Sequence, residues 1–385
     1  MNIVEPILFQ ARLNPQGIAI CTPGTAAESI NYGRLASLTN NIGQAAGSLG
    51  LSRGSVVSID VADRIFHTAI ALGLMRVGIV TVSAPVADLP RELGIQAIIT
   101  DRPRRAVETR VITADPLWTV GESKPLLVPP PDPANDVCRI IITPGSASLG
   151  TSIAFTHANM LGRVARDAHG SGNRFSRSSR LYCDLGIESE PGFRRMIGML
   201  CRGGTIYLFG DSMESLLQAF DLHKVQCMIV APPRLTEYVT LFEMHTIFQS
   251  GFDHILAEGG SLPAGLSERV RARLTPNLFC AYGPAETGIV ALAPAQLIEG
   301  IPGAVGFLTP GAEVEVVDEA DNVLAAGKEG FVRLRTPQIV SAHIGAPEAS
   351  ARAFRDGWFY PGDVGRVTAD RMLILQNRSG PVGNR

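Results

Sequence analysis

Residues 55–82 decide the fold class, and they read S-V-V-S-I-D-V-A-D-R-I-F-H-T-A-I-A-L-G-L-M-R-V-G-I-V-T-V. The β-branched runs at residues 56–61 and 78–82 flank an amphipathic stretch around residues 67–74. Short buried strands that alternate with helical segments are typical of parallel β-α-β units. These residues therefore predict an α/β fold in which helices flank mainly parallel sheets.

The same alternation continues along the chain and ends in a different pattern. It predicts strands at residues 97–101, 137–143, 205–209, 227–231, 254–257 and 278–282, and helices at residues 212–222 and 264–274. A proline-rich connector is expected at residues 125–133. After about residue 302, alternating strands at 313–317 and 330–335 lie between Gly, Asp and Asn turns, as in antiparallel sheets. We expect an α/β core with two sheet subdomains at 1–295, a small β-rich subdomain at 296–376 and the start of a hinge at 377–385.

The composition describes a folded protein without a dominant charge. Of the 385 residues, 45% are hydrophobic and 18% are charged, which excludes a disordered chain. The 34 basic and 36 acidic residues give a net charge of −2, so nucleic acid and anionic membranes are not expected partners. The six cysteines lack zinc spacing and predict reduced, mostly buried thiols. No leader pattern and no long apolar run are present, so we expect no membrane insertion and a cytoplasmic location.

The first candidate motif is the loop I-T-P-G-S-A-S-L-G-T-S at residues 142–152, directly after a predicted strand. Small residues let backbone N–H groups and hydroxyls approach a phosphate closely. The loop lacks the G-K-[ST] of a Walker loop, so an ordinary strand-to-strand connection is the alternative that the pattern alone favours. The chain also lacks G-x-G-x-x-G after its first strand, which argues against a nicotinamide-dependent dehydrogenase.

Two further motifs place carboxylates among small residues. Residues 281–288 read A-Y-G-P-A-E-T-G after a predicted strand, and Glu286 there could hold a hard cation that bridges phosphates. Residues 355–365 read R-D-G-W-F-Y-P-G-D-V-G, where Asp363 could accept hydrogen bonds from ribose hydroxyls. The alternatives are a plain turn with a solvated glutamate and an aspartate that only forms a turn.

The order and spacing of these motifs resemble the superfamily of AMP-forming acyl/aryl-CoA synthetases and adenylation domains, the adenylate-forming enzymes. Residues 282–286 are similar to its Y-G-x-T-E motif, and residues 347–365 are similar to R-P-E-A-T…F-x-D-G-W-[FY]-x-T-G-D-x-G. Residues 377–384 resemble its hinge motif G-R-x-D-D-x-x-N. Further matches lie at residues 153–159, 258–263 and 330–333. The resemblance covers nearly the whole chain and implies the large N-terminal domain of these enzymes.

The resemblance implies that a carboxylate substrate is activated with Mg-ATP to an acyl-adenylate. The acyl group then passes to a thiol, either CoA or the phosphopantetheine arm of a carrier protein. Glu286 would bind Mg²⁺, Asp363 and Arg378 would reach the ribose, and the catalytic candidates are Thr143, Thr151 and Glu286. The remaining implied nucleotide contacts are those of the phosphate loop and the adenine site, namely Thr143, Gly145, Ser146, Ser148, Gly259, Gly260, Tyr282 and Gly283.

Several departures from the superfamily pattern affect this chemistry. Where the superfamily loop reads T-S-G-[ST]-T-G-x-P-K-G, this chain has Pro144, Ala147, Ser148 and Thr151 at the serine, second threonine, next glycine and lysine. Ala285, Pro361 and Gly380 replace two motif threonines and a hinge aspartate. The resemblance also implies a further domain of about 100 residues that carries a catalytic lysine. Because the chain stops at Arg385 inside the hinge motif, we expect a fragment, with a truncated gene as the alternative.

Two functions therefore stay open. The first is an acid–thiol ligase, which by itself is expected to be inactive over these 385 residues. The second is a catalytically degenerate homologue that binds a nucleotide, an acyl ligand or a protein. The implied acyl pocket lies near residues 182–196, where Asp184, Arg194 and Arg195 could indicate a polar or dicarboxylic acid. We favour a solvated helix face as the setting of the two arginines.

Overall fold

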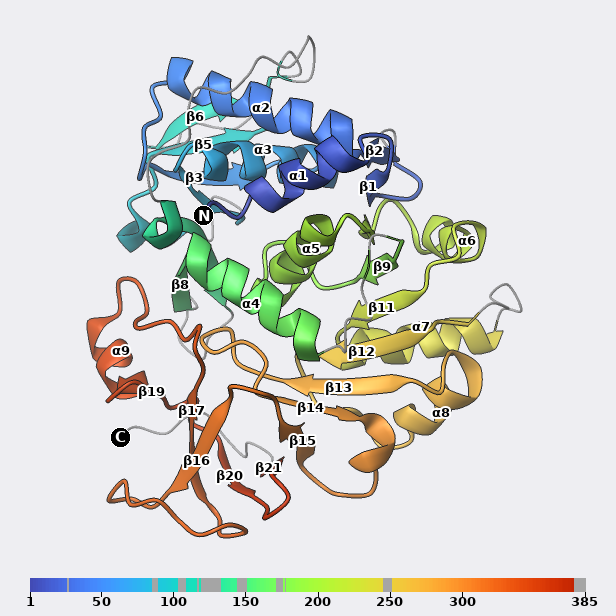
Figure 1. The fold of residues 1–385 in the computed structure, drawn as a ribbon, viewed down its shortest axis with the longest axis vertical. Coiled ribbons are helices and arrows are strands. Elements are labelled where there is room, and N and C mark those ends of the chain that lie inside the picture. Colours follow the sequence, from blue (N-terminus) through green and yellow to red (C-terminus); the bar gives the residue numbers. More distant parts are fainter. Residues whose placement is uncertain are drawn as a thin grey trace. The chain divides into compact units, whose positions relative to one another are not determined.

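The structure is a computed structural model that describes residues 1–25, 28–84, 89–102, 109–115, 118, 133–143, 151–170, 176, 178–244 and 251–376. It forms two compact units, whose elements are labelled in Figure 1. Unit 1 comprises Met1–Ala165, Arg174–Ser179 and Gly186–Ser212. Unit 2 comprises Arg166–Asn173, Arg180–Leu185 and Met213–Arg385.

Unit 1 is built on a six-stranded sheet in the order β6-β5-β3-β4-β7-β8. Its strands are β3 (Val56–Asp60), β4 (Val80–Val82), β5 (Ala97–Thr100), β6 (Arg110–Thr113), β7 (Val137–Thr143) and β8 (Thr151–Thr156). All pairs in this sheet are parallel except β7 with β8. A smaller group in the order β10-β1-β2 consists of β1 (Ile18–Cys21), β2 (Ser29–Asn31) and β10 (Thr205–Tyr207).

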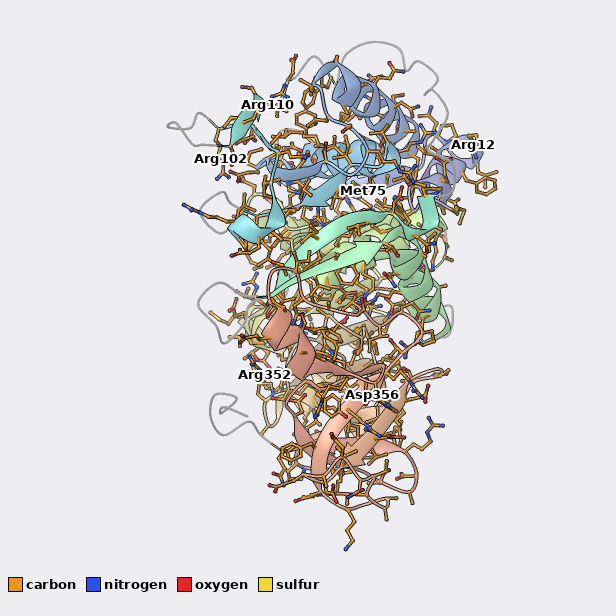
Figure 2. All side chains as sticks on the ribbon, turned by 90° about the vertical axis from the view of Figure 1, so that its left-hand side faces the viewer. Arg12, Met75, Arg102, Arg110, Arg352 and Asp356 are labelled. Carbon is orange, nitrogen blue, oxygen red and sulfur yellow. The ribbon has the colours of Figure 1, made fainter. Side chains whose placement is uncertain are left out.

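The helices of unit 1 include one that the sequence predicts, α3 (Arg64–Arg76), which covers the amphipathic stretch at residues 67–74. The others are α1 (Glu5–Leu13), α2 (Tyr32–Ser48), α5 (Glu190–Arg202) and α4 (His157–Gly170), which continues from unit 1 into unit 2. The side chain of Asp63 caps α3 by accepting from the N–H of Phe66. Met75 of α3 is fully buried, whereas Arg102 and Arg110 are exposed (Figure 2). The parallel β3-α3-β4 unit predicted from residues 55–82 is therefore confirmed.

Unit 2 has strands in the order β18-β19-β17-β20-β21-β15-β14-β13-β12-β11-β9, with β16 paired to β17. The parallel strands are β9 (Arg180–Cys183), β11 (Cys227–Val230), β12 (His254–Glu258) and β13 (Leu278–Tyr282). The antiparallel strands are β14 (Ala291–Pro294), β15 (Ala304–Leu308), β16 (Glu313–Val317), β17 (Gly330–Arg335), β18 (Phe354–Arg355), β19 (Trp358–Phe359), β20 (Val364–Val367) and β21 (Met372–Leu375). Its helices are α6 (Met213–Leu222), α7 (Pro232–Met244), α8 (Leu266–Arg273) and α9 (Pro347–Ala353).

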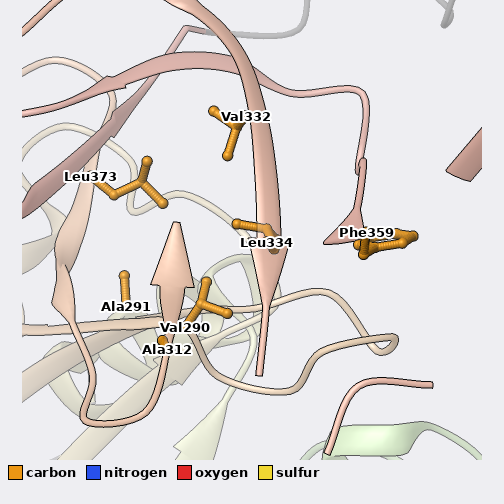
Figure 3. Close-up of a cluster of buried hydrophobic side chains, with 7 residues drawn as sticks. All are labelled: Val290, Ala291, Ala312, Val332, Leu334, Phe359 and Leu373. Carbon is orange, nitrogen blue, oxygen red and sulfur yellow. The ribbon is translucent and has the colours of Figure 1, made fainter. Parts of the chain in front are cut away.

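The antiparallel part of unit 2 has a core of its own. Figure 3 shows seven buried side chains from and around β14, β17, β19 and β21 that gather between the strands, namely Val290, Ala291, Ala312, Val332, Leu334, Phe359 and Leu373. The small antiparallel β region expected after residue 302 is confirmed. The boundary placed at residue 295 stays a prediction.

Other expectations have mixed outcomes. All six cysteines are free thiols, and all but the partly buried Cys201 are buried, as predicted. Across the described ranges, every helix is too short or too polar to cross a lipid bilayer. The connector expected at 125–133 lies almost wholly outside the described residues, and the hinge motif at 377–384 lies wholly outside them.

Candidate functional site

The carboxyl ends of the parallel strands in unit 2 lie at one edge of the sheet. Because Glu258 of β12 pairs with Ala281 of β13, the next residues, Gly259 and Tyr282, stand at the same edge. Gly259 has φ +94 and open space where a Cβ would lie. Gly260 lies beside the ring of Pro232, which is 3.6 Å from its ideal Cβ position. Edges of this kind bind ligands in open α/β sheets.

Tyr282 and Asp363 meet at this edge. The Tyr282 hydroxyl donates a hydrogen bond to Asp363 Oδ2, although the two residues are 81 positions apart. The N–H of Val332 in β17 donates to the Asp363 carbonyl at 2.9 Å, which holds the aspartate backbone at the start of β20. A carboxylate has about four acceptor sites, so the bond from Tyr282 is compatible with further bonds from vicinal hydroxyls.

The motif before Asp363 is explained by a tight hairpin between β18 and β19. Arg355 pairs with Trp358, so the two residues between them, Asp356 and Gly357, form the loop. Both have positive φ, +50 and +78, as a type I′ turn requires (Asp356 is labelled in Figure 2). The Asp-Gly of the sequence motif therefore serves the backbone, which leaves Asp363 as the motif's candidate ligand-binding carboxylate.

Glu286 lies in a compact turn after β13. Gly283 is required there, because a Cβ at this position would lie 2.1 Å from the carbonyl oxygen of Gly288. The N–H groups of Thr287 and Gly288 donate to the Pro284 carbonyl at 3.1 and 2.9 Å. These two hydrogen bonds close the turn, and Glu286 lies within it.

The Glu286 carboxylate is largely buried and has a neighbouring histidine. Its side chain is 12% exposed, and Oε1 lies 3.0 Å from Nε2 of His343. Mg²⁺ in nucleotide sites is commonly bound by one or two carboxylates together with substrate phosphates. A single oriented carboxylate at the sheet edge fits that donor set.

The two ends of the predicted phosphate loop lie in unit 1. Thr143 ends β7 and Thr151 begins β8, and the two are paired across the antiparallel ladder. The Thr143 hydroxyl donates to the Thr151 carbonyl at 3.0 Å, so this hydroxyl is engaged within the hairpin. The strand predicted at 137–143 is confirmed as β7. Gly145, Ser146 and Ser148 of the loop lie outside the described residues, as does Arg378.

The prediction that Arg194 and Arg195 form a solvated helix face is wrong. Their exposures are 1% and 5%, and α5 buries most of its surface. Oε1 of Glu190 accepts from Arg194 Nε at 2.9 Å and from the Arg163 guanidinium at 2.8 Å. Because Glu190 lies one turn before Arg194, the ion pair forms within the helix. Arg194 is thus part of an internal charge cluster.

Asp184 also has its hydrogen-bond partners within the protein, and no sequence motif links these partners to it. Its Oδ1 accepts from the hydroxyls of Tyr182 and Tyr238, each at 2.7 Å, and its Oδ2 accepts from Arg234 Nε at 3.1 Å. Burial, followed by the neighbouring tyrosine and aspartate, raises the pKa of Tyr182, so this phenol stays a donor. The network lies at the carboxyl ends of β9 and β11, because the N–H of Asp184 bonds the Ile229 carbonyl at 2.9 Å.

Of the predicted site residues in unit 2, the structure joins Tyr282 to Asp363 and places Gly259 beside Tyr282 at the strand ends. His343 and Tyr238 lie outside every motif quoted from the sequence. The only signal for His343 was its position four residues before the 347–365 motif. Nothing in the sequence linked it to Glu286, 57 residues away.

Similarities to known proteins identify the family of the chain. The model of the family described as AMP-binding enzyme matches residues 9–342. The 3-hydroxybenzoate–CoA ligase of Aromatoleum sp. (strain CIB) is 26% identical over 401 residues, which cover 94% of this chain and 73% of the ligase. A nonribosomal peptide synthetase, malG, of Malbranchea aurantiaca is 26% identical over 367 residues, 90% of this chain and 15% of that protein.

The fold is shared with solved structures. The N-terminal domain of FACL13 from Mycobacterium tuberculosis has a TM-score of 0.86 at 19% identity, with 98% of this chain and 100% of that domain covered. This likeness confirms the α/β architecture expected from the resemblance to adenylate-forming enzymes. With a family model that matches most of its length, the chain belongs to the AMP-binding enzyme family.

Proposed function

We propose that the chain binds ATP and AMP at the sheet edge of unit 2 and takes part in the reaction of an AMP-forming acid–thiol ligase. In this reaction a small carboxylic acid is activated as an acyl-adenylate and then transferred to CoA or to the phosphopantetheine arm of a carrier protein. The observation that supports the proposal most is the hydrogen bond from Tyr282 to Asp363, which joins two motifs at the edge where Glu286 also lies.

The proposed roles follow from the donor and acceptor types. Asp363 and Arg378 would bind the ribose, while Gly259, Gly260, Tyr282 and Gly283 would flank the adenine. Glu286 would hold Mg²⁺, which supplies charge neutralisation on the phosphates when bound. The loop from Thr143 to Ser152, with Gly145, Ser146 and Ser148, would enclose the β- and γ-phosphates. Catalysis by such a site consists of aligning the carboxylate with the α-phosphorus and compensating negative charge.

A degenerate homologue that binds a nucleotide without turnover is the second candidate. It is favoured by the loop composition, because Thr151 stands where the superfamily has a lysine and Pro144 offers no backbone N–H. The bond from the Thr143 hydroxyl to the Thr151 carbonyl points the same way, since that hydroxyl is already engaged.

The wider organisation is part of the same proposal. We propose an α/β core at residues 1–295, a β-rich subdomain at 296–376 and a hinge that begins at 377.

The nonribosomal peptide synthetase among the relatives supports a carrier protein as the alternative to CoA as acyl acceptor. We propose the cytoplasm as the site of action.

Asp363→Ala is expected to weaken ATP and AMP binding alike, by about 10- to 100-fold. The loss corresponds to about 1.5–3 kcal/mol for hydrogen bonds to a charged group. Calorimetric titration with Mg-ATP and, separately, with AMP measures both dissociation constants. Asp356→Asn is the matched control, because this exposed turn residue of the same motif keeps its backbone conformation as asparagine. Unchanged affinity in Asp363→Ala would remove the ribose assignment.

Thr151→Lys is expected to tighten ATP binding by several-fold and to leave AMP binding nearly unchanged. The added charge would stand at the start of β8 and face the β- and γ-phosphates, which AMP lacks. The same titrations test this expectation, with Thr151→Gln as a control that adds length without charge. An equal gain for both nucleotides would contradict the phosphate-loop assignment.

A further inference from the structure

His343 contacts the candidate cation-binding carboxylate from a segment that no motif includes. Its Nε2 lies 3.0 Å from Glu286 Oε1, and the exposures of the two side chains are 8% and 12%. A carboxylate can only accept a hydrogen bond, so Nε2 carries the proton and donates. The opposite ring nitrogen, Nδ1, is buried and has no hydrogen-bond partner among the described residues.

The imidazole ring is fixed on its other sides. Phe354 lies edge-on to it, with ring centroids 5.0 Å apart and an interplanar angle of 69°. Phe359 lies edge-on at 6.5 Å and 85°. The Ser350 hydroxyl accepts from the His343 N–H at 2.9 Å and donates to the His343 carbonyl at 3.1 Å. Both the backbone and the ring of His343 are therefore held by α9 and by the β18-β19 hairpin that leads to Asp363.

The Glu286 backbone is held from the same side. The N–H of Val340, three residues before His343, donates to the Glu286 carbonyl at 3.0 Å. The segment 340–343 therefore contacts Glu286 at two points, the main-chain carbonyl and the side-chain carboxylate of Glu286. A free glutamate side chain loses rotamer freedom when it binds a ligand, and a fixed donor removes part of that cost beforehand.

We propose that His343 is a positioning residue that orients the Glu286 carboxylate for the divalent cation of a bound nucleotide. This inference rests on the proposed function. Partners that orient a metal-binding side chain commonly change metal affinity by 10- to 100-fold when they are removed. In this chain Thr151 stands in place of a loop lysine, so the cation carries a larger share of the charge compensation on the phosphates.

The test compares two substitutions that separate packing from hydrogen bonding. His343→Phe keeps a ring against Phe354 and Phe359 but removes the donor, whereas His343→Gln keeps an N–H donor and removes the ring. His343→Phe is expected to weaken Mg-ATP binding about 10-fold and to leave magnesium-free AMP binding unchanged. His343→Gln is expected to restore most of the Mg-ATP affinity while lowering the melting temperature. Titration calorimetry and thermal unfolding of the full chain give these values.

A double-substitution cycle tests whether His343 acts through Glu286. In a Glu286→Gln background, His343→Phe is expected to cause no further loss of Mg-ATP affinity, because the oriented group is gone. Mn²⁺ titration followed by electron paramagnetic resonance provides a direct cation readout. His343→Leu serves as a second donor-free variant if the phenylalanine variant does not fold.

Several results would overturn the inference. They are wild-type Mg-ATP affinity in the donor-free variants, an equal loss in the Gln and Phe variants, or additive losses with Glu286→Gln. Asp363-dependent nucleotide binding that persists alongside any of these results would leave the proposed function standing and remove only the role of His343. Absence of all nucleotide and Mn²⁺ binding by the wild-type chain would overturn both.

Discussion

Glu190→Gln is expected to lower the free energy of unfolding by about 3–5 kcal/mol, the range for breaking a buried ion pair from one side. Glu190 is 3% exposed and accepts from two guanidinium groups that are themselves 1–2% exposed, those of Arg163 and Arg194. An amide keeps the size of the side chain but removes the charge that faces both arginines. The cost is large because buried charges are stable only while they are paired.

Urea unfolding followed by circular dichroism measures this change. Glu243→Gln is the matched control, because Glu243 pairs with Arg269 at the surface, where both side chains are about 40% exposed (41% and 39%). Exposed pairs are screened by solvent and contribute little to stability, so this control is expected to unfold nearly as the wild type does. A loss below 1 kcal/mol for Glu190→Gln would mean that the arginines are compensated by other groups.

The burial of Arg194 and Arg195 could not be predicted from the sequence. Helix α5 has two adjacent arginines, and adjacent charged residues on a helix usually mark its solvated side. The structure buries both. Around Arg194, Glu190 one turn earlier and Arg163 on α4 form a charge network. The contribution of Arg163, 27 residues from Glu190, could not be seen in the local pattern.

The strands were predictable because their signals are local. The predicted strands at 137–143, 278–282, 313–317 and 330–335 coincide with β7, β13, β16 and β17. Buried parallel strands form apolar runs of a few residues, and antiparallel ones alternate between turn residues. Both patterns can be identified within a window of about ten residues.

The site was predictable only where a motif carried its own signal. Tyr282, Glu286 and Asp363 stand in motifs with turn residues around them, and the structure brings Tyr282 and Asp363 together. Tyr238 reaches Asp184 across 54 residues, and His343 reaches Glu286 across 57. Such pairs form only when sheets and helices assemble. The local pattern of hydrophobic and polar residues in one sequence does not show them.

Unit 1 is expected to lose stability in mild acid because two of its buried histidines are held neutral. Burial, followed by the charge of Arg139, lowers the pKa of His67 from 6.5 to about 3. Burial lowers the pKa of His157 to about 4, although Asp136 opposes the shift. One nitrogen of each ring also makes a hydrogen bond, since His67 Nε2 lies 2.5 Å from Ser83 Oγ and His157 Nδ1 accepts from the Ile3 N–H at 3.1 Å.

The difference in proton uptake between the unfolded and the folded chain sets the direction in which stability changes with pH. In the unfolded chain both histidines bind protons as the pH falls below 6.5, whereas in the folded chain they bind them only near pH 4 and pH 3. The unfolded state therefore gains protons first, and stability is complete above about pH 7 and falls as the pH is lowered. The slope for each group is about half of its limiting 1.4 kcal/mol per pH unit at pH 6.5 and approaches that limit at lower pH, so the two together are expected to remove about 4 kcal/mol between pH 6.5 and 4.5.

His67→Gln is expected to halve this slope, because glutamine can bond to Ser83 without titrating. Urea unfolding at several pH values between 7 and 4.5 measures the slope independently of any constant loss that the substitution causes at pH 7. An unchanged slope would assign the acid sensitivity to other groups.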